Sequence, residues 1–519
     1  MALLADAMQG REFRMIYEAN APWMSKYGPD RLPADALSFD RDRVPKDLSP
    51  GGFEAVVFST VQPRPAPLNL LHWALWNDLP AIAIQESNQL ALSSGRFNNY
   101  LAPVDHVLVA SASEQAHLAA TGVDPERIEI TGWPFYTHSG PVSDETRRAA
   151  KMRLGLDPES LVAALTLTAY RDSGESEGVR IEQLRMAREG LRTAYQLVIK
   201  PHPIESMTVL RRFVEDYARG ATILDGTIPI DDLLNAADVL LNRGVSQVCF
   251  EALLKAIPVV VLDVGDHTPF HDSAPRVVAS DSRAVSEIVR GIEKSANPMA
   301  PYRSVLDRHM PFTSIRAKEI TCERISSIIE THSAHRRNKQ WLEFALTYAW
   351  QVDRHVALSV LRGVDCGALG HAMSKLMRRR ATEQDLELLV AHWRGQYAEQ
   401  MLLCLLCEQL RAGKRHVEQF HLDLMRRFIS PVNLHLYCRH YELWGRVLLD
   451  GGHVDEYGRF REALESRRSE AYQVEQALDR LDGYNRGWIR RCLARANDGR
   501  GIAIRLLRRT RHVLRDPLR

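Results

Sequence analysis

The sequence of 519 residues lacks several features that would each point to a class of protein. It contains only seven cysteines, an odd number at scattered positions, which argues against disulfides and favours free thiols in a reducing compartment. No apolar run reaches the ~18 residues that a membrane-spanning helix needs, and no secretory signal segment is evident. A formal net charge of +2 gives no overall basis for binding nucleic acid. We therefore expect a cytoplasmic protein without a nucleic-acid partner.

Residue clusters that would hold a metal ion are also missing. Cys404 and Cys407 form a single Cys-x-x-Cys pair inside an apolar helical run, where both thiols share one face and are expected in a core. His267 and His271 have the spacing of a metal pair on a helix, but Pro269 between them argues against such a helix. The sequence therefore predicts neither a metal nor a cofactor.

What the chain does contain is the alternation of a layered protein. Up to about residue 334, short apolar runs without polar alternation are separated by helical segments, which predicts parallel sheets covered on both faces. Beyond residue 335 such runs stop, and apolar residues recur at helical spacing. We predict fold class α/β, with Rossmann-like domains at 1–140 and 141–334 and an all-α domain at 335–519.

Two features of the last domain suggest partners. Residues 405–414 and 444–453 resemble each other, and in each a helix ends on glycine before a second helix, as in the repeats of a TPR-like α-solenoid that binds partners. The alternative is a helical bundle that braces the other domains. The tail Arg500–Arg519 has seven arginines around one apolar helix face, which predicts peripheral contact with an anionic membrane or docking on the protein's own surface.

Two polar loops interrupt the stretch from Leu197 to Asp263. Lys200–Pro203, with the sequence Lys-Pro-His-Pro, and Asn242–Gln247 each follow a short apolar run that predicts a buried parallel strand. Ligands bind at the carboxyl ends of such strands. The sequence therefore predicts that both loops border one binding site.

The second loop has the residues of an anion site. Gly244 allows the backbone to approach a ligand closely. Ser246 and Gln247 open a helix whose free N–H groups and positive dipole end favour an anion. Glu251, in the first turns of that helix, can accept hydrogen bonds from a ribose. With the positive charge of the Lys200–Pro203 loop, these residues predict a site for a nucleoside mono- or diphosphate.

These residues also carry a resemblance. The donor-binding half of GT-B fold glycosyltransferases resembles this chain at Ala-Asp-Val 237–239, Gly-Val-Ser 244–246, Phe-Glu-Ala-Leu 250–253 and Pro-Val-Val 258–260. Lys-Pro-His-Pro is similar to the His-Pro motif of bacterial sialyltransferases and of capsule glycosyl- and glycerophosphotransferases. Residues 110–134 are similar to the end of the N-terminal GT-B domain, where the turn at Gly132 faces the donor phosphates. The resemblance covers roughly residues 1–330, although the usual first strand and its glycine loop are not evident in residues 1–20.

The resemblance implies a metal-independent glycosyltransferase of the GT-B type. It would move a sugar from a nucleotide-activated donor, a CMP-nonulosonic acid or Kdo-type sugar or a UDP-sugar, to a surface glycan, a lipid-linked glycan or a protein. The phosphate leaving group would be stabilised by Lys200, His202, Arg243 and the helix that opens at Ser246. Glu86, at the carboxyl end of a predicted strand of the first domain, is the candidate base for the acceptor hydroxyl. The catalytic residues that we expect are Glu86 and His202.

A wider set of residues is expected to hold the donor. Thr168 and Arg171 follow the first strand of the second domain, where Arg171 is either a phosphate clamp or a solvated loop residue. The donor-binding residues that we expect are Gly132, Thr168, Arg171, Lys200, His202, Pro203, Arg243, Gly244, Ser246, Gln247 and Glu251.

Three other functions are compatible with the same pattern. CDP-polyol phosphotransferases share the His-Pro motif but usually carry Asp-Tyr-Ser-Ser where this chain has 242–246. UDP-GlcNAc 2-epimerases share the fold, but their His-x-Glu-Ala-Gly-like loop is only partly matched by Gln85-Glu86-Ser87. A non-catalytic GT-B scaffold that binds partners is the third alternative, which the missing first strand favours.

Overall fold

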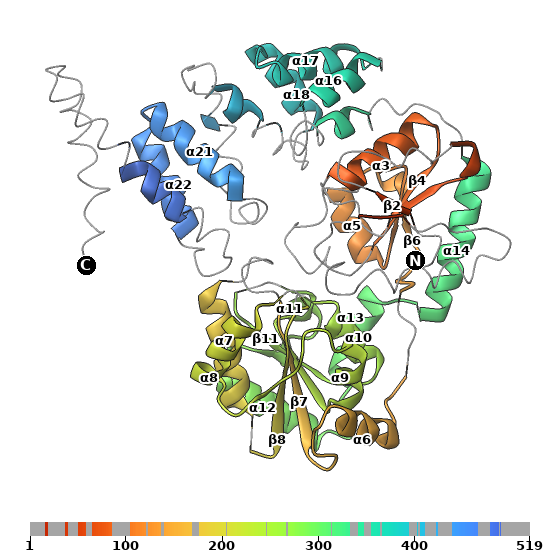
Figure 1. Ribbon diagram of the computed structural model, residues 1–519, viewed down its shortest axis with the longest axis vertical. Coiled ribbons are helices and arrows are strands. Elements are labelled where there is room, and N and C mark those ends of the chain that lie inside the picture. Colours follow the sequence, from red (N-terminus) through yellow and green to blue (C-terminus); the bar gives the residue numbers. More distant parts are fainter. Residues whose placement is uncertain are drawn as a thin grey trace, which may run out of the picture. The chain divides into compact units, whose positions relative to one another are not determined.

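A computed structural model describes the parts of the chain that form the two predicted α/β domains and pieces of the helical region (Figure 1). The described residues are 16–18, 37–39, 50–58, 65–85, 104–120, 123–135, 140–168, 176–191, 193–203, 205–244, 246–265, 268–312, 314–332, 341–346, 354–363, 366–393, 402, 405–410, 422–423, 438–465, 478–486 and 488.

The first domain is built on a parallel sheet of four strands in sequential order. These strands are β3 (Val56–Phe58), β4 (Ala81–Ile84), β5 (His106–Val109) and β6 (Ile128–Ile130). Helices α3 (Pro65–Trp76) and α5 (Ala112–Ala120) make the crossovers that parallel strands require. Strand β1 (Ile16–Glu18) pairs with β2 (Leu37–Phe39) in a separate parallel pair.

The second domain contains a parallel sheet of six strands in the order β12-β11-β10-β7-β8-β9. The strands are β7 (Leu161–Thr166), β8 (Tyr195–Lys200), β9 (Thr222–Ile223), β10 (Val239–Asn242), β11 (Val259–Leu262) and β12 (Val278–Ala279). The chain starts at β7 in the middle, moves outward to β9, and then returns to β10 on the other side of β7. This is the doubly wound order of a Rossmann domain, and its switch point lies between β7 and β10.

Helices cover both faces of this sheet (Figure 1). On one face, α7 (Glu177–Gly190), α8 (Met207–Tyr217) and α12 (Ser282–Lys294) bury apolar residues against the strands. On the other face lie α6 (Asp144–Arg153), α9 (Ile230–Ala236), α10 (Val248–Leu254), α11 (Pro269–Ser273) and α13 (Arg303–His309). Both side-chain rows of a strand are therefore buried, which explains why the strands read as continuous apolar runs.

One helix returns to the first domain. In α14 (Ser314–Thr331), Cys322, Ile325 and Ile328 pack against Ile82, Ile84 and Leu108 of the first sheet. The chain therefore crosses back from the second domain to cover the first sheet.

The helical region begins with α16 (Arg354–Gly363), α17 (Gly367–Met377) and α18 (Glu383–His392) and includes α21 (Cys438–Asp450) and α22 (Val454–Glu465). The chain divides into two compact units, one of Met1–Ser173 with Gly178–Cys366, the other of Gly174–Glu177 with Gly367–Arg519. The predicted helix pair around Gly452 is present as α21 and α22, with Gly452 at a φ of 78° between them. Most of the second helix expected in the other repeat, 417–428, lies outside the described residues, so the solenoid remains a prediction.

The expected fold class, α/β with two Rossmann-like domains followed by an all-α region, is confirmed. In the part of the chain that the structure describes, no helix combines the length and the apolar character needed to cross a bilayer. The tail Arg500–Arg519 lies outside the described residues, and its membrane contact remains a prediction.

Candidate functional site

The two polar loops leave the second sheet on either side of strand β7. Thr166, the last residue of β7, is in register with Lys200 of β8, and Leu165 is in register with Leu241 of β10. Since neighbouring strands lie about 4.8 Å apart, the backbones of Lys200 and Asn242 are about 10 Å apart across β7. The sequence prediction that these loops border one site is consistent with this register, and the site is the switch point of the sheet.

A buried asparagine joins the strands at this edge. The Asn242 side chain donates to the hydroxyl of Thr166 at 2.7 Å and to its carbonyl at 3.2 Å. Its oxygen accepts the backbone N–H of Gly244 at 2.8 Å and the thiol of Cys249 at 3.3 Å. One amide therefore fixes the end of β7, the turn of the second loop and the start of α10. The sequence analysis gave Asn242 no such role, although a polar residue ending an apolar strand was a usable signal.

Gly244 has a φ of 78°, in the left-handed region that favours glycine. A β-carbon at Gly244 would lie 2.9 Å from Cγ1 of Val261 and 3.0 Å from the hydroxyl of Thr268. The turn therefore requires glycine for its conformation and for close packing within the protein, in addition to any approach of a ligand. The turn is followed by Ser246, Gln247 and then α10, as the sequence predicted. Arg243, which precedes Gly244, is buried.

The first loop contains one buried cation and one exposed imidazole. The Lys200 ammonium donates to the carbonyl of Gly226 at 2.7 Å and to that of Pro201 at 3.2 Å. Lys200 is buried, so in the structure it braces the loop that follows β9. His202 is exposed to solvent, and its carbonyl accepts the N–H of Glu205 at 2.9 Å. Of the two residues, His202 is the one with access to a ligand.

A buried ion pair lies beneath the same edge. Arg180 of α7 donates to the carbonyl of Thr168 at 2.7 Å and to the Glu205 carboxylate at 3.3 Å. The Arg180 side chain is 0% exposed and that of Glu205 is 2% exposed. This pair connects two predicted site segments, the exit of β7 and the His202 loop, and the sequence analysis did not identify it.

Glu251 lies in the first turns of α10, as predicted for a ribose contact. Burial, followed by the nearby Asp231 carboxylate, raises the pKa of Glu251 to about 7, while Lys255 lowers it. The Lys255 ammonium itself contacts Asp231 at 3.0 Å and Asn235 at 2.8 Å. Glu251 can therefore change its protonation state near neutral pH.

The segment after β11 contributes His271, which was not predicted as a site residue. Pro269 was expected to argue against a helix here, but α11 begins at Pro269, because a proline fits the first turn of a helix. His267 lies outside the described residues. His271 Nδ1 lies 3.0 Å from the Thr268 hydroxyl, and His271 Nε2 lies 3.7 Å from Asp263. Thr268 in turn neighbours Gly244, so this group borders the second loop. Within the described ranges, no cluster of His, Cys, Asp and Glu could hold a metal ion.

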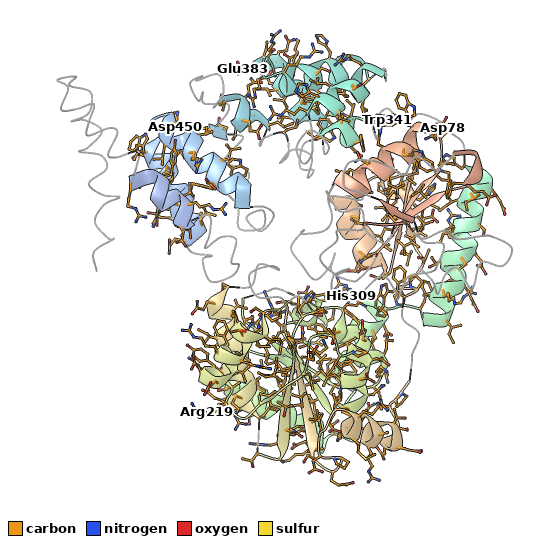
Figure 2. The ribbon with its side chains drawn as sticks, viewed as in Figure 1. Asp78, Arg219, His309, Trp341, Glu383 and Asp450 are labelled. Atoms are coloured by element: carbon orange, nitrogen blue, oxygen red, sulfur yellow. The ribbon has the colours of Figure 1, made fainter. Side chains whose placement is uncertain are left out.

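Helix α10 is anchored by aromatic packing. The ring centroid of Phe250 lies 5.9 Å from that of Phe270 and 6.0 Å from that of His309, the last residue of α13, which is labelled in Figure 2. Burial, with a smaller contribution from Arg308, lowers the pKa of His309 to about 4. The imidazole is therefore neutral at physiological pH and packs as an aromatic ring.

The first sheet also has a buried polar group at its carboxyl edge. Gln85, at the end of β4, donates to Glu114 of α5 at 2.7 Å, and the same carboxyl accepts the N–H of Ala110 at 3.1 Å. Burial raises the pKa of Glu114 to about 8, although these hydrogen bonds lower it. This contact fixes the end of β4, and Gln85 directly precedes the predicted base Glu86 in the sequence.

Of the remaining predicted residues, the structure describes Gly132, Thr168 and Pro203. Gly132 has a φ of 80°, and a β-carbon there would lie 2.6 Å from that of Ala317 in α14, so close packing explains this glycine. Glu86 and Arg171 lie outside the described residues, and their roles remain predictions. Thr168 and Pro203 lie at the carboxyl edge beside β7 and β8.

Two Rossmann-like domains in succession, with a helix that returns from the second to the first, define a fold of the GT-B class. No protein-family profile matches the sequence, and no curated protein matches it. The structure is similar to that of Anabaena HepE in complex with UDP and glucose, at 12% identity and a TM-score of 0.44, covering 63% of this chain and 94% of that one.

Two further solved structures are similar at the same level. The wall teichoic acid polymerase TagF has 14% identity and a TM-score of 0.39, covering 63% of this chain and 85% of the other. UDP-GlcNAc 2-epimerase from Neisseria meningitidis, bound to UDP-GlcNAc, has 13% identity and a TM-score of 0.39, covering 56% and 86%. Likeness at these values does not indicate which reaction the present chain performs.

Proposed function

We propose that this protein is a metal-independent glycosyltransferase that takes a sugar from a nucleotide-activated donor. The observation that carries the proposal is the convergence of the Lys200–Pro203 and Asn242–Gln247 loops on the switch point of a doubly wound sheet. Parallel sheets bind nucleotides at this position. In this proposal the nucleotide phosphates lie between His202 and the turn after Gly244, and Glu251 contacts the ribose.

The chemistry requires that the leaving phosphate be stabilised and the acceptor hydroxyl lose its proton. In this proposal the exposed imidazole of His202, which can donate a hydrogen bond, and the backbone amides around Ser246 stabilise the charge that develops on the phosphate. The acceptor base is proposed to be Glu86, from the segment after Gln85. The motif Lys-Pro-His-Pro favours a CMP-activated sugar of the sialic acid or Kdo type, with a UDP-sugar as the alternative donor.

Calorimetric titration of the full-length protein with CMP, UDP, GDP and CDP tests the donor site. We expect one nucleotide to bind, with at least a tenfold loss of affinity in His202→Ala and in Glu251→Ala, since each loses a polar contact worth about 1.5 kcal/mol or more. His371→Ala is the matched control, because His371 is an exposed histidine on α17 in the other compact unit. Binding that is equal in wild type, His202→Ala and Glu251→Ala would place the nucleotide elsewhere and reject this site.

Product analysis separates transfer from the other reactions of this fold class. With the nucleotide-sugar that binds, chromatography and mass spectrometry should show free nucleotide together with a sugar joined to a glycan, lipid-linked glycan or protein acceptor. An epimerised sugar that is still attached to its nucleotide would identify an epimerase. Transfer of a polyol phosphate from a CDP donor would identify a phosphotransferase, and the absence of nucleotide binding would favour a scaffold.

We also propose that the C-terminal tail brings the enzyme to an anionic membrane where lipid-linked acceptors lie. Co-sedimentation with vesicles of phosphatidylglycerol and phosphatidylcholine should weaken in Arg508→Glu with Arg511→Glu, because each arginine near an anionic surface contributes about 1 kcal/mol. Arg378→Glu, at an exposed position next to α17, is the charge-matched control. Equal sedimentation of all three proteins would remove the membrane from the proposal.

A further inference from the structure

We infer that the buried Arg180–Glu205 ion pair is a positioning device, which holds the His202 loop at a fixed place beside the exit of β7. The inference concerns residues outside the predicted site, and its consequence for ligand binding rests on the proposed function. Neither residue touches the ligand in this proposal. Both act through the backbone segments that carry Thr168 and His202.

The contacts form a continuous chain between the two segments. The Arg180 guanidinium donates to the carbonyl of Thr168 at 2.7 Å and to the carboxylate of Glu205 at 3.3 Å. The backbone N–H of Glu205 donates to the carbonyl of His202 at 2.9 Å, which closes the loop that carries the imidazole. The guanidinium therefore adds a side-chain link between the two segments beyond the last backbone bond of the strand pair, in which the Leu167 N–H donates to the carbonyl of Lys200 at 3.1 Å.

The burial of the pair argues that it serves more than stability. Arg180 is 0% exposed and Glu205 is 2% exposed, and taking two charges out of water is unfavourable. Apolar residues of similar volume often stabilise such a position equally well or better. They could not donate to the Thr168 carbonyl or fix the loop through a directed contact. Arginine is also suited to this role because its Nη2 donates to both acceptors, while the planar guanidinium keeps that nitrogen in a fixed orientation.

A second ion pair in the same sheet provides an internal comparison. Lys151 of α6 contacts Asp238 at 3.0 Å, and the same Asp238 oxygen accepts the N–H of Val162 at 2.8 Å. Lys151 is 5% exposed and Asp238 is 15% exposed. This pair braces the beginning of β7, at the opposite edge from the binding loops. Its removal should affect the fold without moving His202.

The decisive variant replaces both charges, Arg180→Met with Glu205→Met, so that no charge is left buried alone. Native-state hydrogen exchange of full-length protein, read as the protection factor of the backbone amide at position 205, reports on the His202 loop whether or not a ligand binds. The protection factor corrects for the changed side chain at that position. We expect the double variant to unfold at a denaturant concentration near that of wild type, while the protection factor at position 205 falls about tenfold. Titration with CMP and UDP should show about tenfold weaker binding of the nucleotide that wild type binds.

Two further variants keep the test decisive. Lys151→Met with Asp238→Asn is the matched control. It should leave both the exchange rate of the Glu205 amide and the nucleotide affinity within twofold of wild type. Arg180→Lys, which retains the charge but replaces the planar guanidinium with a shorter and freely rotating ammonium, should give an intermediate exchange rate at position 205. This variant decides the question where the double variant does not fold.

The outcomes separate this inference from the function on which it rests. Unchanged protection at position 205 in both Arg180 variants would overturn the positioning role, whatever the nucleotides do. Faster exchange in a protein whose wild type binds neither CMP nor UDP would support the positioning role and count against the proposed function. Faster exchange with unchanged nucleotide affinity would overturn the inferred consequence for the binding site.

Discussion

Replacing Asn242 with alanine should destabilise the second domain strongly, because one side chain there serves three elements. The substitution removes two hydrogen bonds donated to Thr166 and one accepted from the buried Gly244 N–H. Each bond contributes about 1 kcal/mol net, and the buried N–H left without a partner adds a penalty of about 1–3 kcal/mol. The three bonds and this penalty together give an expected loss of about 4–6 kcal/mol.

The measurement is urea-induced unfolding of the full-length protein, in which the shift in midpoint at constant m gives the change in stability. Thr166→Val, which removes only the hydroxyl that Asn242 contacts at 2.7 Å, should cost about 1 kcal/mol. The double variant should lose less than the sum by about 1 kcal/mol, because the two side chains share a bond. Asn297→Ala, at an exposed position, is the control and should stay within about 0.5 kcal/mol.

The isosteric change Asn242→Asp adds a pH signature. The new carboxyl group would be buried, so its folded pKa should rise above the unfolded value of about 3.9. The unfolded chain then loses its proton first as the pH rises, and the deficit against wild type should grow from pH 4 towards pH 7. A cost below about 1 kcal/mol for Asn242→Ala, or a pH-independent deficit for Asn242→Asp, would refute the role assigned to this amide.

Three further changes test neighbouring features. Gly244→Ala should cost about 2 kcal/mol of stability, because φ is 78° and the new β-carbon would lie 2.9 Å from Cγ1 of Val261. The same change should abolish nucleotide binding. A variant with the urea midpoint and the nucleotide affinity of wild type would contradict this prediction. In wild type, stability should fall as the pH rises from 4.5 to about 8, because the folded state keeps the Glu114 proton longer than the unfolded chain does. Glu114→Gln should abolish this pH dependence. Parallel pH profiles for the two proteins would exclude this effect. In wild type, stability should fall as the pH falls from 6.5 to about 4, because the unfolded chain takes up a proton on His309 before the folded state does. His309→Phe should abolish this acid sensitivity. Identical acid midpoints for the two proteins would argue against this effect.

The layered fold was predictable from the sequence because burial on both faces leaves a direct trace. Runs such as Leu197–Ile199 and Val259–Leu262 lack polar residues, and both proved to be buried strands. Helix α13 was missed because Val305 and Leu306 are its only aliphatic residues, too few to show helical periodicity. Helix α10 has the same length but is apolar except at Glu251, and it was predicted.

The candidate site was only partly predictable, because sequence patterns identify which residues are polar but not what they contact. His202 and Lys200 are two residues apart in one motif, yet one is exposed and the other is buried against backbone carbonyls. The partners Arg180 and Glu205 are separated by 25 residues, and no local pattern connects them. Contacts of this kind depend on how α7 packs on the sheet, which is decided by tertiary structure.

The return of α14 has a consequence for how the chain can reach its native state. The inner face of the first sheet, including Ile82 and Leu108, is covered by residues that follow in the chain more than 200 positions later. During synthesis that face must stay uncovered until residue 331 has left the ribosome. A truncated product ending at residue 140 would expose the same apolar surface permanently. The first domain therefore needs residues up to α14, far beyond its own sheet, to complete its core.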